Sequence, residues 1–219
     1  SLESGNLASL DAIARLFTAR GEPAEAVPWL QPRLERTPAG SERAVIVLQL
    51  ADALLAAGKT DKATQVLARS VVEDPKEPRT REILLRLYRD AQAWEPLAAL
   101  LQSAAHHIED RAQLLSYFYE AAAIFRDRLG ASDRAIPVLE QLRALVPDAV
   151  GVQRSLADAL WSAQRVAEAR AILEKMLADF GRRRSPDRAH VHTKLAALAR
   201  AEGNRVEALA QLELATSMD

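Results

Sequence analysis

Residues 51–75 read ADALLAAGKTDKATQVLARSVVEDP, and this stretch decides the fold. Ala51, Leu54 and Ala57 are spaced three apart, which places them on one face of a helix. Gly58 follows, at a position where a helix end favours a residue that adopts the left-handed backbone conformation. A second amphipathic segment then runs to a proline, which cannot continue a helix. The stretch therefore predicts two antiparallel helices joined by a short turn, a helical hairpin.

The turn of this hairpin is short and polar. It reads Lys59, Thr60 and Asp61, and either Thr60 or Asp61 is expected to cap the second helix with its side-chain oxygen. Leu67, on the apolar face of the second helix, is expected to be fully buried between neighbouring hairpins.

The same pattern recurs about six times along the chain. Each copy has a turn residue, a mostly small residue five positions later and a leucine nine positions later, and successive turns are 34 to 39 residues apart. A unit of about 34 residues with small insertions accounts for all the copies. The turn residues are Gly21, Gly58, Gln92, Gly130, Gln164 and Gly203. The leucines are Leu30, Leu67, Leu101, Leu139, Leu173 and Leu212.

These residues resemble the tetratricopeptide repeat (TPR) family, whose unit of about 34 residues has small residues, a glycine turn and a closing proline at fixed places. The prolines are Pro38, Pro75 and Pro147, whereas the third copy lacks the glycine, the alanines and the proline. The resemblance implies an all-α fold, a right-handed superhelical solenoid of antiparallel helix hairpins with about 12 helices. We expect one array over residues 1–219, with units at about 7–40, 44–77, 78–111, 115–149, 150–183 and 189–219.

Two units are expected to be irregular, and both ends of the chain look cut. Pro28 and Pro32 lie in the second helix of the first unit, where Pro32 should kink the helix; a poorly ordered first hairpin is the alternative. The fourth unit should have a longer first helix, over residues 111–129. The chain does not begin with Met and stops at Asp219, one residue before a closing proline is due, so we expect a fragment of a larger, bacterial protein.

Composition excludes several classes of protein. The net charge is −1, which argues against a broad nucleic-acid-binding surface, and cysteine is absent, which excludes disulfides. No apolar run is long enough to span a membrane, and no signal peptide is present. We expect a cytoplasmic location, or a periplasmic one if the chain is a fragment.

No pattern of catalytic or cofactor-binding residues stands out, so an enzyme, a metal site and a cofactor are not expected. The adjacent pair His106 and His107, and His190 and His192 two residues apart, do not share a helix face, which favours surface histidines over a metal site. The arginines of 182–184 are expected to be a solvated loop rather than a nucleic-acid or lipid contact. RNA-reading repeats carry a polar code at fixed positions, and the corresponding residues here vary too much for one. They are Asp11, Leu48, Glu82, Tyr119, Arg154 and Thr193.

One subtype of the family is excluded by its motif. Chaperone-binding members clamp a C-terminal carboxylate with lysine and asparagine from successive first helices. At the matching positions this chain has Asp11 and Arg15, then Leu48 and Asp52, and its asparagines lie near the ends of the sequence. The carboxylate clamp is therefore absent.

The resemblance places the first helices on a concave groove, where this chain carries several arginines and two aromatic residues. Such a mixture is typical of binding hot spots, and guanidinium groups suit carboxylates, which indicates a protein or peptide partner that is acidic. The alternative is a solvated face with internal ion pairs, for example from Arg86 to Glu82 or Asp90. The candidate partner-binding residues are Arg79, Arg86, Arg89, Tyr119, Arg126, Arg154 and Trp161.

The sequence thus predicts a protein–protein interaction module or scaffold that binds a partner segment in the groove. Two other functions remain open. The chain is either a structural spacer or self-association segment of a longer solenoid, acting through its terminal repeats, or a scaffold for export or assembly in the cell envelope.

Overall fold

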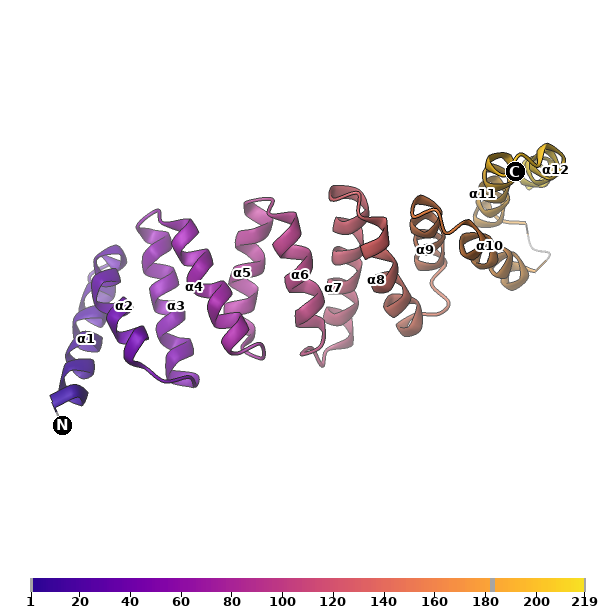
Figure 1. Ribbon diagram of the computed structural model, residues 1–219. Helices are drawn as coiled ribbons and strands as arrows, with labels where there is room; N and C mark the ends of the chain where they lie inside the picture. The colour runs from indigo at the N-terminus through magenta and orange to yellow at the C-terminus, as the bar shows by residue number, and fades with distance from the viewer. Residues whose placement is uncertain (1, 182–183, 219) are drawn as a thin grey trace. The chain divides into compact units, whose positions relative to one another are not determined.

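A computed structural model describes residues 2–181 and 184–218, with side chains from residue 8 onward. Over these residues the chain has twelve α-helices and no strands, as the repeat pattern predicts (Figure 1). We call the odd-numbered helices A helices and the even-numbered ones B helices, because each A helix is followed by its antiparallel B helix. The helices are α1 (Leu2–Ala19), α2 (Val27–Arg36), α3 (Ser41–Ala56), α4 (Thr60–Glu73), α5 (Pro78–Asp90), α6 (Trp94–Ala105), α7 (Arg111–Ala123), α8 (Ser132–Leu145), α9 (Val150–Ser162), α10 (Val166–Phe180), α11 (Pro186–Ala201) and α12 (Arg205–Thr216). A 3₁₀ segment, η1 (Pro23–Ala26), precedes α2, and a π-helical segment, η2 (Ile124–Arg128), follows α7.

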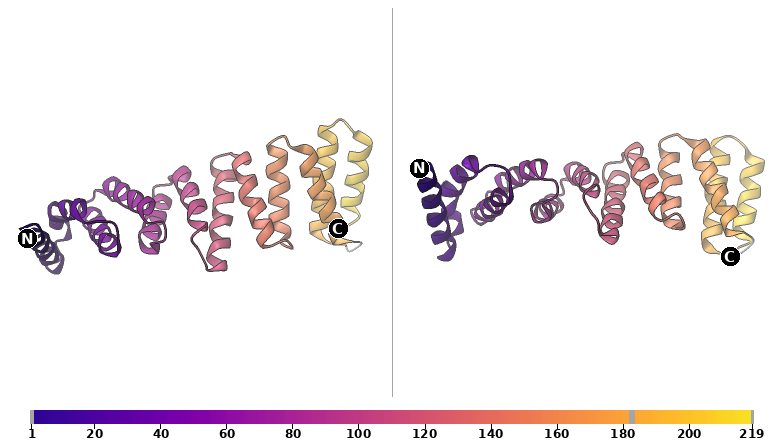
Figure 2. Two further views of the ribbon diagram at one scale, coloured as in Figure 1. Left: turned by 60° about the horizontal axis from the view of Figure 1, so that its bottom comes forward. Right: turned by 90° about the horizontal axis from the view of Figure 1, so that it is seen from below.

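The chain divides into two compact units, an N-terminal unit of residues 1–100 and a C-terminal unit of residues 101–219. In the N-terminal unit α1 packs on α2, α2 on α3, α3 on α4 and α4 on α5. In the C-terminal unit the same order of neighbours runs from α7 to α12, and Figure 2 shows its last four helices side by side in orange and yellow. Within each unit, a helix therefore packs against the helices that precede and follow it in the sequence.

Five of the six turns have the same backbone hydrogen bonds. At Gly58, the N–H donates to the Leu55 carbonyl (3.0 Å) and the Lys59 N–H donates to the Leu54 carbonyl (2.8 Å), which satisfies two carbonyls at the end of α3. This motif needs a residue with positive φ, and all six predicted turn residues have φ between 52° and 81°, which confirms the turn register. They are Gly21, Gly58, Gln92, Gly130, Gln164 and Gly203.

The fourth turn differs because one extra residue precedes it. The predicted long first helix forms, but its last five residues, Ile124–Arg128, are π-helical. The Ala131 N–H consequently reaches back to the Phe125 carbonyl (2.7 Å), one residue further than at the other turns. Phe125 is fully buried, with the guanidinium of Arg134 over its ring at 4.4 Å. The wide turn thus places an aromatic ring inside the hairpin.

The repeated small and apolar residues form the core. Leu67 is fully buried, as predicted, and so are the equivalent leucines of the earlier and later hairpins except Leu212 in α12, which is exposed. Around the first junction between hairpins, Val27 and Leu30 of α2 belong to one buried cluster with Ile46 and Leu50 of α3. The B helices α2, α4, α8 and α10 are therefore each buried on two sides, by their own A helix and by the next one, whereas α11 is the one described neighbour of α12.

The predicted cap of α4 is wrong. The helix begins at Thr60, so the residue at the N-cap is Lys59, which makes no side-chain cap, and its carbonyl accepts from the Ala63 N–H (3.1 Å). The left-handed turn at Gly58 leaves room for only one non-helical residue before the helix starts. Side chains cap α5, α7, α11 and α12 instead, through Glu77, Asp110, Ser185 and Asn204.

The first hairpin forms despite its two prolines. Helix α2 starts at Val27, so Pro28 falls in the first turn, where its missing N–H removes no helix bond. Pro32 lies inside the helix, as predicted, and deletes the bond that would run to the carbonyl of residue 28. The η1 segment, which replaces the first turn of the B helix, lets α2 begin late enough to hold Pro28 at its start.

Candidate functional site

The three predicted arginines of the N-terminal unit lie on the exposed side of α5. Arg79, Arg86 and Arg89 are all solvent-exposed. The alternative interpretation, ion pairs from Arg86 to Glu82 or Asp90, is not seen, since neither Arg79 nor Arg86 has a carboxylate partner among the described residues. These two guanidinium groups, seven residues apart on one face, therefore remain available to an external anionic group.

In the C-terminal unit, Arg126 joins two A helices. Its guanidinium makes a bidentate contact with Asp127 (2.7 and 2.8 Å) and donates to the Ser155 hydroxyl of α9 (3.0 Å). The hydrogen bonds to Asp127 raise the pKa of the Arg126 guanidinium and lower the pKa of the Asp127 carboxyl. Both groups stay charged near neutral pH, and the Arg126 side chain is fixed in place against α9.

A second set of contacts joins α9 to α11. The Lys194 ammonium lies 2.7 Å from an Asp158 oxygen and 5.9 Å from the centre of the Trp161 ring. The Arg154 guanidinium is 3.8 Å from Asp187, at the start of α11. Arg154, Trp161 and Lys194 are each partly exposed, so a cation–aromatic cluster with balancing carboxylates lies at the surface of these two helices.

His190 belongs to the same surface, where the sequence indicated a surface histidine without a role in binding. Its ring is half-buried, and its Nε2 has no hydrogen-bond partner. Burial, together with the neighbouring cations of Arg154 and Lys194, lowers the pKa of His190 below its ordinary value, against the smaller opposing effect of Asp158 and Asp187. The imidazole is therefore held neutral beside two permanent cations.

The structure thus brings Arg126, Arg154 and Trp161 of the predicted set onto adjoining A-helix segments of one unit. Tyr119 is exposed on α7, seven residues before Arg126. The surface of η2, α9 and α11 that carries Arg126, Arg154, Trp161 and Lys194 is called here the C-terminal A face. Ser155, Asp187 and His190 complete it. Sequence spacing could not have placed them there, because Ser155 and Asp187 contact residues of other helical segments and the pKa of His190 is lowered in part by Arg154 of α9.

The prediction that the histidines lie on the surface is correct for some of them only. His106 and His107 are exposed, as expected, but His192 is buried, and its Nδ1 lies 2.7 Å from the Gln211 Oε1 of α12. The expectation of a surface position for His192 is wrong because the side of α11 that carries it is covered by α12. No cluster of three or more potential metal ligands occurs among the described residues.

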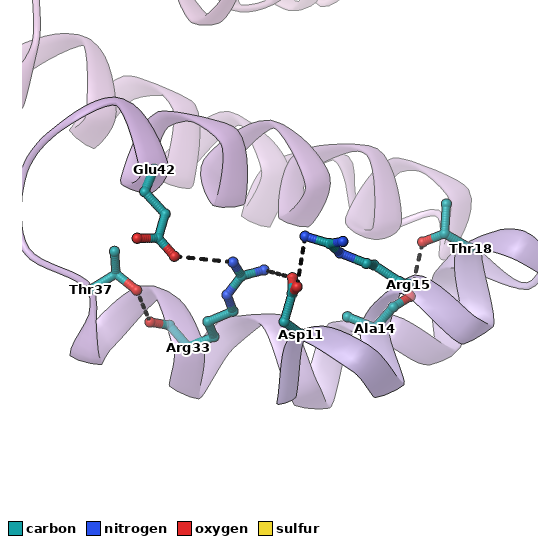
Figure 3. Close-up of polar contacts among 7 residues, drawn as sticks. All are labelled: Asp11, Ala14, Arg15, Thr18, Arg33, Thr37 and Glu42. Atoms are coloured by element: carbon teal, nitrogen blue, oxygen red, sulfur yellow. Dashed lines mark hydrogen bonds and ion pairs between the residues drawn. The ribbon is translucent and has the colours of Figure 1, made fainter. Parts of the chain in front are cut away.

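In the N-terminal unit, Asp11 and Arg15, two of the four residues at the clamp positions, are engaged in an internal ion pair (Figure 3). Asp11 pairs with Arg15 of its own helix (2.8 Å) and with the buried Arg33 of α2, which also reaches Glu42 of α3 at 3.3 Å. Arg33 is held between two carboxylates from neighbouring A helices, as the close-up shows. Since Asp11 is anionic and already paired with two arginines, it cannot bind a carboxylate of a partner.

The N-terminal unit also has a groove that the sequence did not predict. It lies between α2 and α4 over a floor of Val47, Leu50 and Leu54, with a volume of about 420 Å³. Arg43 crosses it, with its guanidinium bonded to the Thr37 carbonyl (2.9 Å) and to Glu73 (2.9 Å). The groove is therefore spanned by a side chain that ties α3 to the ends of both B helices.

Two remaining expectations concern the basic loop and the membrane. Arg182 and Arg183 lie outside the described residues, and Arg184 is exposed. Within the described ranges, none of the helices has the length and apolar character needed to cross a bilayer.

These features define the class of the protein, an all-α repeat protein built from antiparallel helix hairpins. Residues 44–69 and residues 128–184 each match a family model described as tetratricopeptide repeat. Both segments are therefore tetratricopeptide repeats.

Two solved structures have a similar fold. YrrB, a TPR protein with an unusual peptide-binding site, is 14% identical with a TM-score of 0.52, and the match covers 80% of this chain and 86% of that one. MamA from Desulfovibrio magneticus RS-1, from residue 41 to its end, is 14% identical with a TM-score of 0.50, over 82% of this chain and 97% of that one. At this identity the likeness shows a shared fold. A search of curated proteins found no matching sequence.

Proposed function

We propose that this protein is a non-catalytic interaction module, or scaffold, whose A helices bind a segment of a partner protein. TPR proteins are in general scaffolds of this kind. The observation that carries the proposal is the C-terminal A face, where Arg126, Arg154 and Lys194 are fixed by contacts between helices and Trp161 is partly exposed beside them. Side chains held in place before binding lose little entropy when a partner arrives, and arginine and tryptophan are typical hot-spot residues.

For the N-terminal unit by itself, we propose that α5 binds an acidic segment. Arg79 and Arg86 are exposed, have no carboxylate partner among the described residues and lie on one face, so carboxylates of the partner can pair with them without breaking an internal ion pair. On the C-terminal A face, by contrast, each cation already has a carboxylate nearby. There the contact with the partner is expected to rest on Trp161 and on hydrogen bonds to the fixed arginine groups.

The proposal is tested by affinity capture from the source cells, followed by measurement of the dissociation constant for the captured protein. Two variants remove the proposed contacts: Arg79→Glu with Arg86→Glu on α5, and Arg154→Ala with Trp161→Ala on α9. The matched control carries Arg69→Glu and Lys175→Glu, which change two exposed cations on the B helices α4 and α10. Circular dichroism of each variant checks that the helices are intact.

We expect each A-helix variant to weaken binding about tenfold or more, while the control binds as the unchanged protein does. Raising the salt concentration should weaken binding through the α5 arginines and should have less effect once these are replaced. Equal binding by all three variants would contradict an A-helix site. Loss of binding in the control alone would move the site to the B-helix side.

A further inference from the structure

Two exposed arginines of α5 that have no carboxylate partner are separated by almost two helical turns. Arg79 and Arg86 are seven residues apart. At a rise of about 1.5 Å per residue, their positions differ by about 10.5 Å along the helix axis. Because two turns contain about 7.2 residues, both side chains leave α5 on nearly the same side. Helix α5 therefore presents two cationic groups at a spacing that the helix sets.

A carboxylate lies between these two arginines on the same side of α5. Glu82 is three residues after Arg79 and four before Arg86, is exposed, and has no cationic partner among the described residues. Asp90 is exposed four residues beyond Arg86, and Arg89, at the edge of this side, already has an interaction partner. A partner's carboxylate is attracted at Arg79 and Arg86 and is repelled between them. The pattern therefore favours two separate acidic groups over an unbroken acidic run.

The exposed side of α5 is charged along its whole length. Over residues 79–90, every solvent-exposed residue carries a charge, whereas Leu84, Leu85 and Leu87 are buried. An amphipathic helix that docks on another protein does so through apolar residues three, four and seven positions apart. A segment that binds α5 through charge alone is therefore an extended one, whose side chains reach both arginines.

Among extended conformations, the polyproline II helix matches the spacing of the arginines. Its side chains return to the same edge every three residues, about 9.3 Å apart. In a β-strand, side chains on one face are two residues apart, at about 6.7 Å, or four residues apart, at about 13 Å. The polyproline II value differs by about 1 Å from the axial spacing of Arg79 and Arg86, and the two β-strand values differ by about 3 to 4 Å.

We propose that Arg79 and Arg86 bind a polyproline II segment of the partner protein in which two acidic residues lie three positions apart. One carboxylate pairs with each arginine. The two residues between the acidic ones are uncharged and turn to the other edges of the segment, away from Glu82. Proline at these places holds the segment in its bound conformation beforehand, which lowers the entropy cost of binding. The inference rests on the proposed function, because it specifies the acidic segment that α5 is proposed to bind.

Two synthetic peptides of equal composition test the spacing, each acetylated and amidated so that its ends carry no charge. The spaced peptide is Gly-Pro-Glu-Pro-Pro-Glu-Pro-Gly. The adjacent peptide is Gly-Pro-Pro-Glu-Glu-Pro-Pro-Gly, whose two carboxylates leave different edges. Titration at about 20 mM ionic strength, followed by NMR of the arginine side-chain N–H groups, gives each dissociation constant. An alanine-rich helical peptide with two glutamates seven positions apart tests a helical partner.

Three variants show which side chains the peptides contact. Arg86→Gln removes one of the two proposed ion pairs, and Glu82→Gln removes the carboxylate between the arginines. Arg69→Gln on α4 is the matched control, since the Arg69 side chain is 78% exposed. All three replaced residues are exposed, and circular dichroism verifies that the variants keep their helices.

We expect the spaced peptide to bind about two- to fivefold tighter than the adjacent peptide, which is the effect of one exposed ion pair. Arg86→Gln should abolish this preference, Glu82→Gln should reduce it, and Arg69→Gln should keep it.

Three results contradict the proposal in different ways. Equal binding of the two peptides, or a preference that survives Arg86→Gln, overturns the spacing but leaves an acidic site on α5 in place. Tighter binding of the helical peptide overturns the extended conformation. Binding of no peptide overturns the inference together with the acidic site on α5, whereas the contact proposed at Trp161 has its own variant and its own test.

Discussion

Gln92 and Gln164 occupy the same place in two different hairpins, and both adopt the left-handed backbone conformation, with φ of 52° and 61°. The other four hairpins have glycine there. A side chain at positive φ is strained, since its Cβ approaches the backbone, at a cost of roughly 1–2 kcal/mol. The turn is nevertheless formed at both sites because the packed helices on either side, rather than the turn residue, hold it in place.

Gln92→Gly and Gln164→Gly are therefore expected to stabilise the protein, by about 0.5–1 kcal/mol each, because glycine relieves the strain but also adds entropy to the unfolded chain. Placing a side chain at one of the glycine turns, by Gly58→Ala, should destabilise the protein by a similar amount. No heavy atom lies near the added Cβ, so the effect of that change comes from the backbone alone. Urea denaturation followed by circular dichroism measures all three, and a destabilised glutamine-to-glycine variant would show that the glutamine side chain has a role of its own.

Leu67→Ala and Leu212→Ala form a matched pair, because the two leucines lie at the same position of α4 and α12. Leu67 is fully buried, so its truncation should lower the free energy of unfolding by about 2–5 kcal/mol. Leu212 is half exposed, and its truncation should lower it by about 1 kcal/mol or less. Chemical denaturation at a low protein concentration, where chains stay apart, gives both values. Equal losses would mean that α12 is covered in solution.

Replacing Arg33 by alanine is expected to destabilise the N-terminal unit by about 1–3 kcal/mol, since it removes a buried cation that lies between Asp11 and Glu42. The figure is modest because Glu42 is largely exposed and Asp11 keeps its pair with Arg15. Arg15→Ala is the control and should cost about 0.5 kcal/mol or less, since the Arg15 side chain is mostly exposed. Thermal unfolding of the two variants compares them, and a small effect of Arg33→Ala would show that the ion pairs offset little more than the burial of the guanidinium.

His190 should make the stability of the C-terminal unit depend on pH. Because its pKa is lower in the folded chain than in the unfolded chain, the unfolded chain binds the proton first as the pH falls. The stabilisation is complete above the ordinary histidine pKa of about 6.5 and is lost as the pH falls from there through the folded value.

Unfolding by urea at a series of pH values from about 7.5 to about 5 tests this. His190→Asn should remove part of the decline, whereas His106→Asn, at an exposed position, should leave the decline unchanged. A His190→Asn profile identical to that of the unchanged protein would contradict the prediction.

Much of the fold could be predicted because its signals are local and repeated. Gly58 and the leucine at 67 define a turn and a buried position in one hairpin, and five further copies fix the register. The cap of α4 and the π-helical end at Phe125 could not be predicted in the same way. Each depends on how one helix settles against its neighbour, and no spacing in the sequence encodes that.

The candidate site was predictable to a smaller degree. The helix period placed Arg126, Arg154 and Trp161 on A helices, facing away from the hairpin core. Their contacts with Ser155, Asp187 and Lys194 join residues that are about 29 to 33 positions apart, roughly one repeat of the family pattern, and follow from packing between hairpins. His192 was misplaced for the same reason, since only the docked α12 shows which side of α11 is covered.

The sequence by itself determined the repeat, the six turns and the faces of each helix, because glycine conformation and helix period act within a single hairpin. Tertiary structure decided which equivalent residues are buried. Leu67 and Leu212 have the same place in the pattern, yet one is enclosed and the other exposed, because α5 packs on α4 and no second described helix packs on α12. It also decided which charges are paired, since an ion pair forms between side chains that packing brings within reach.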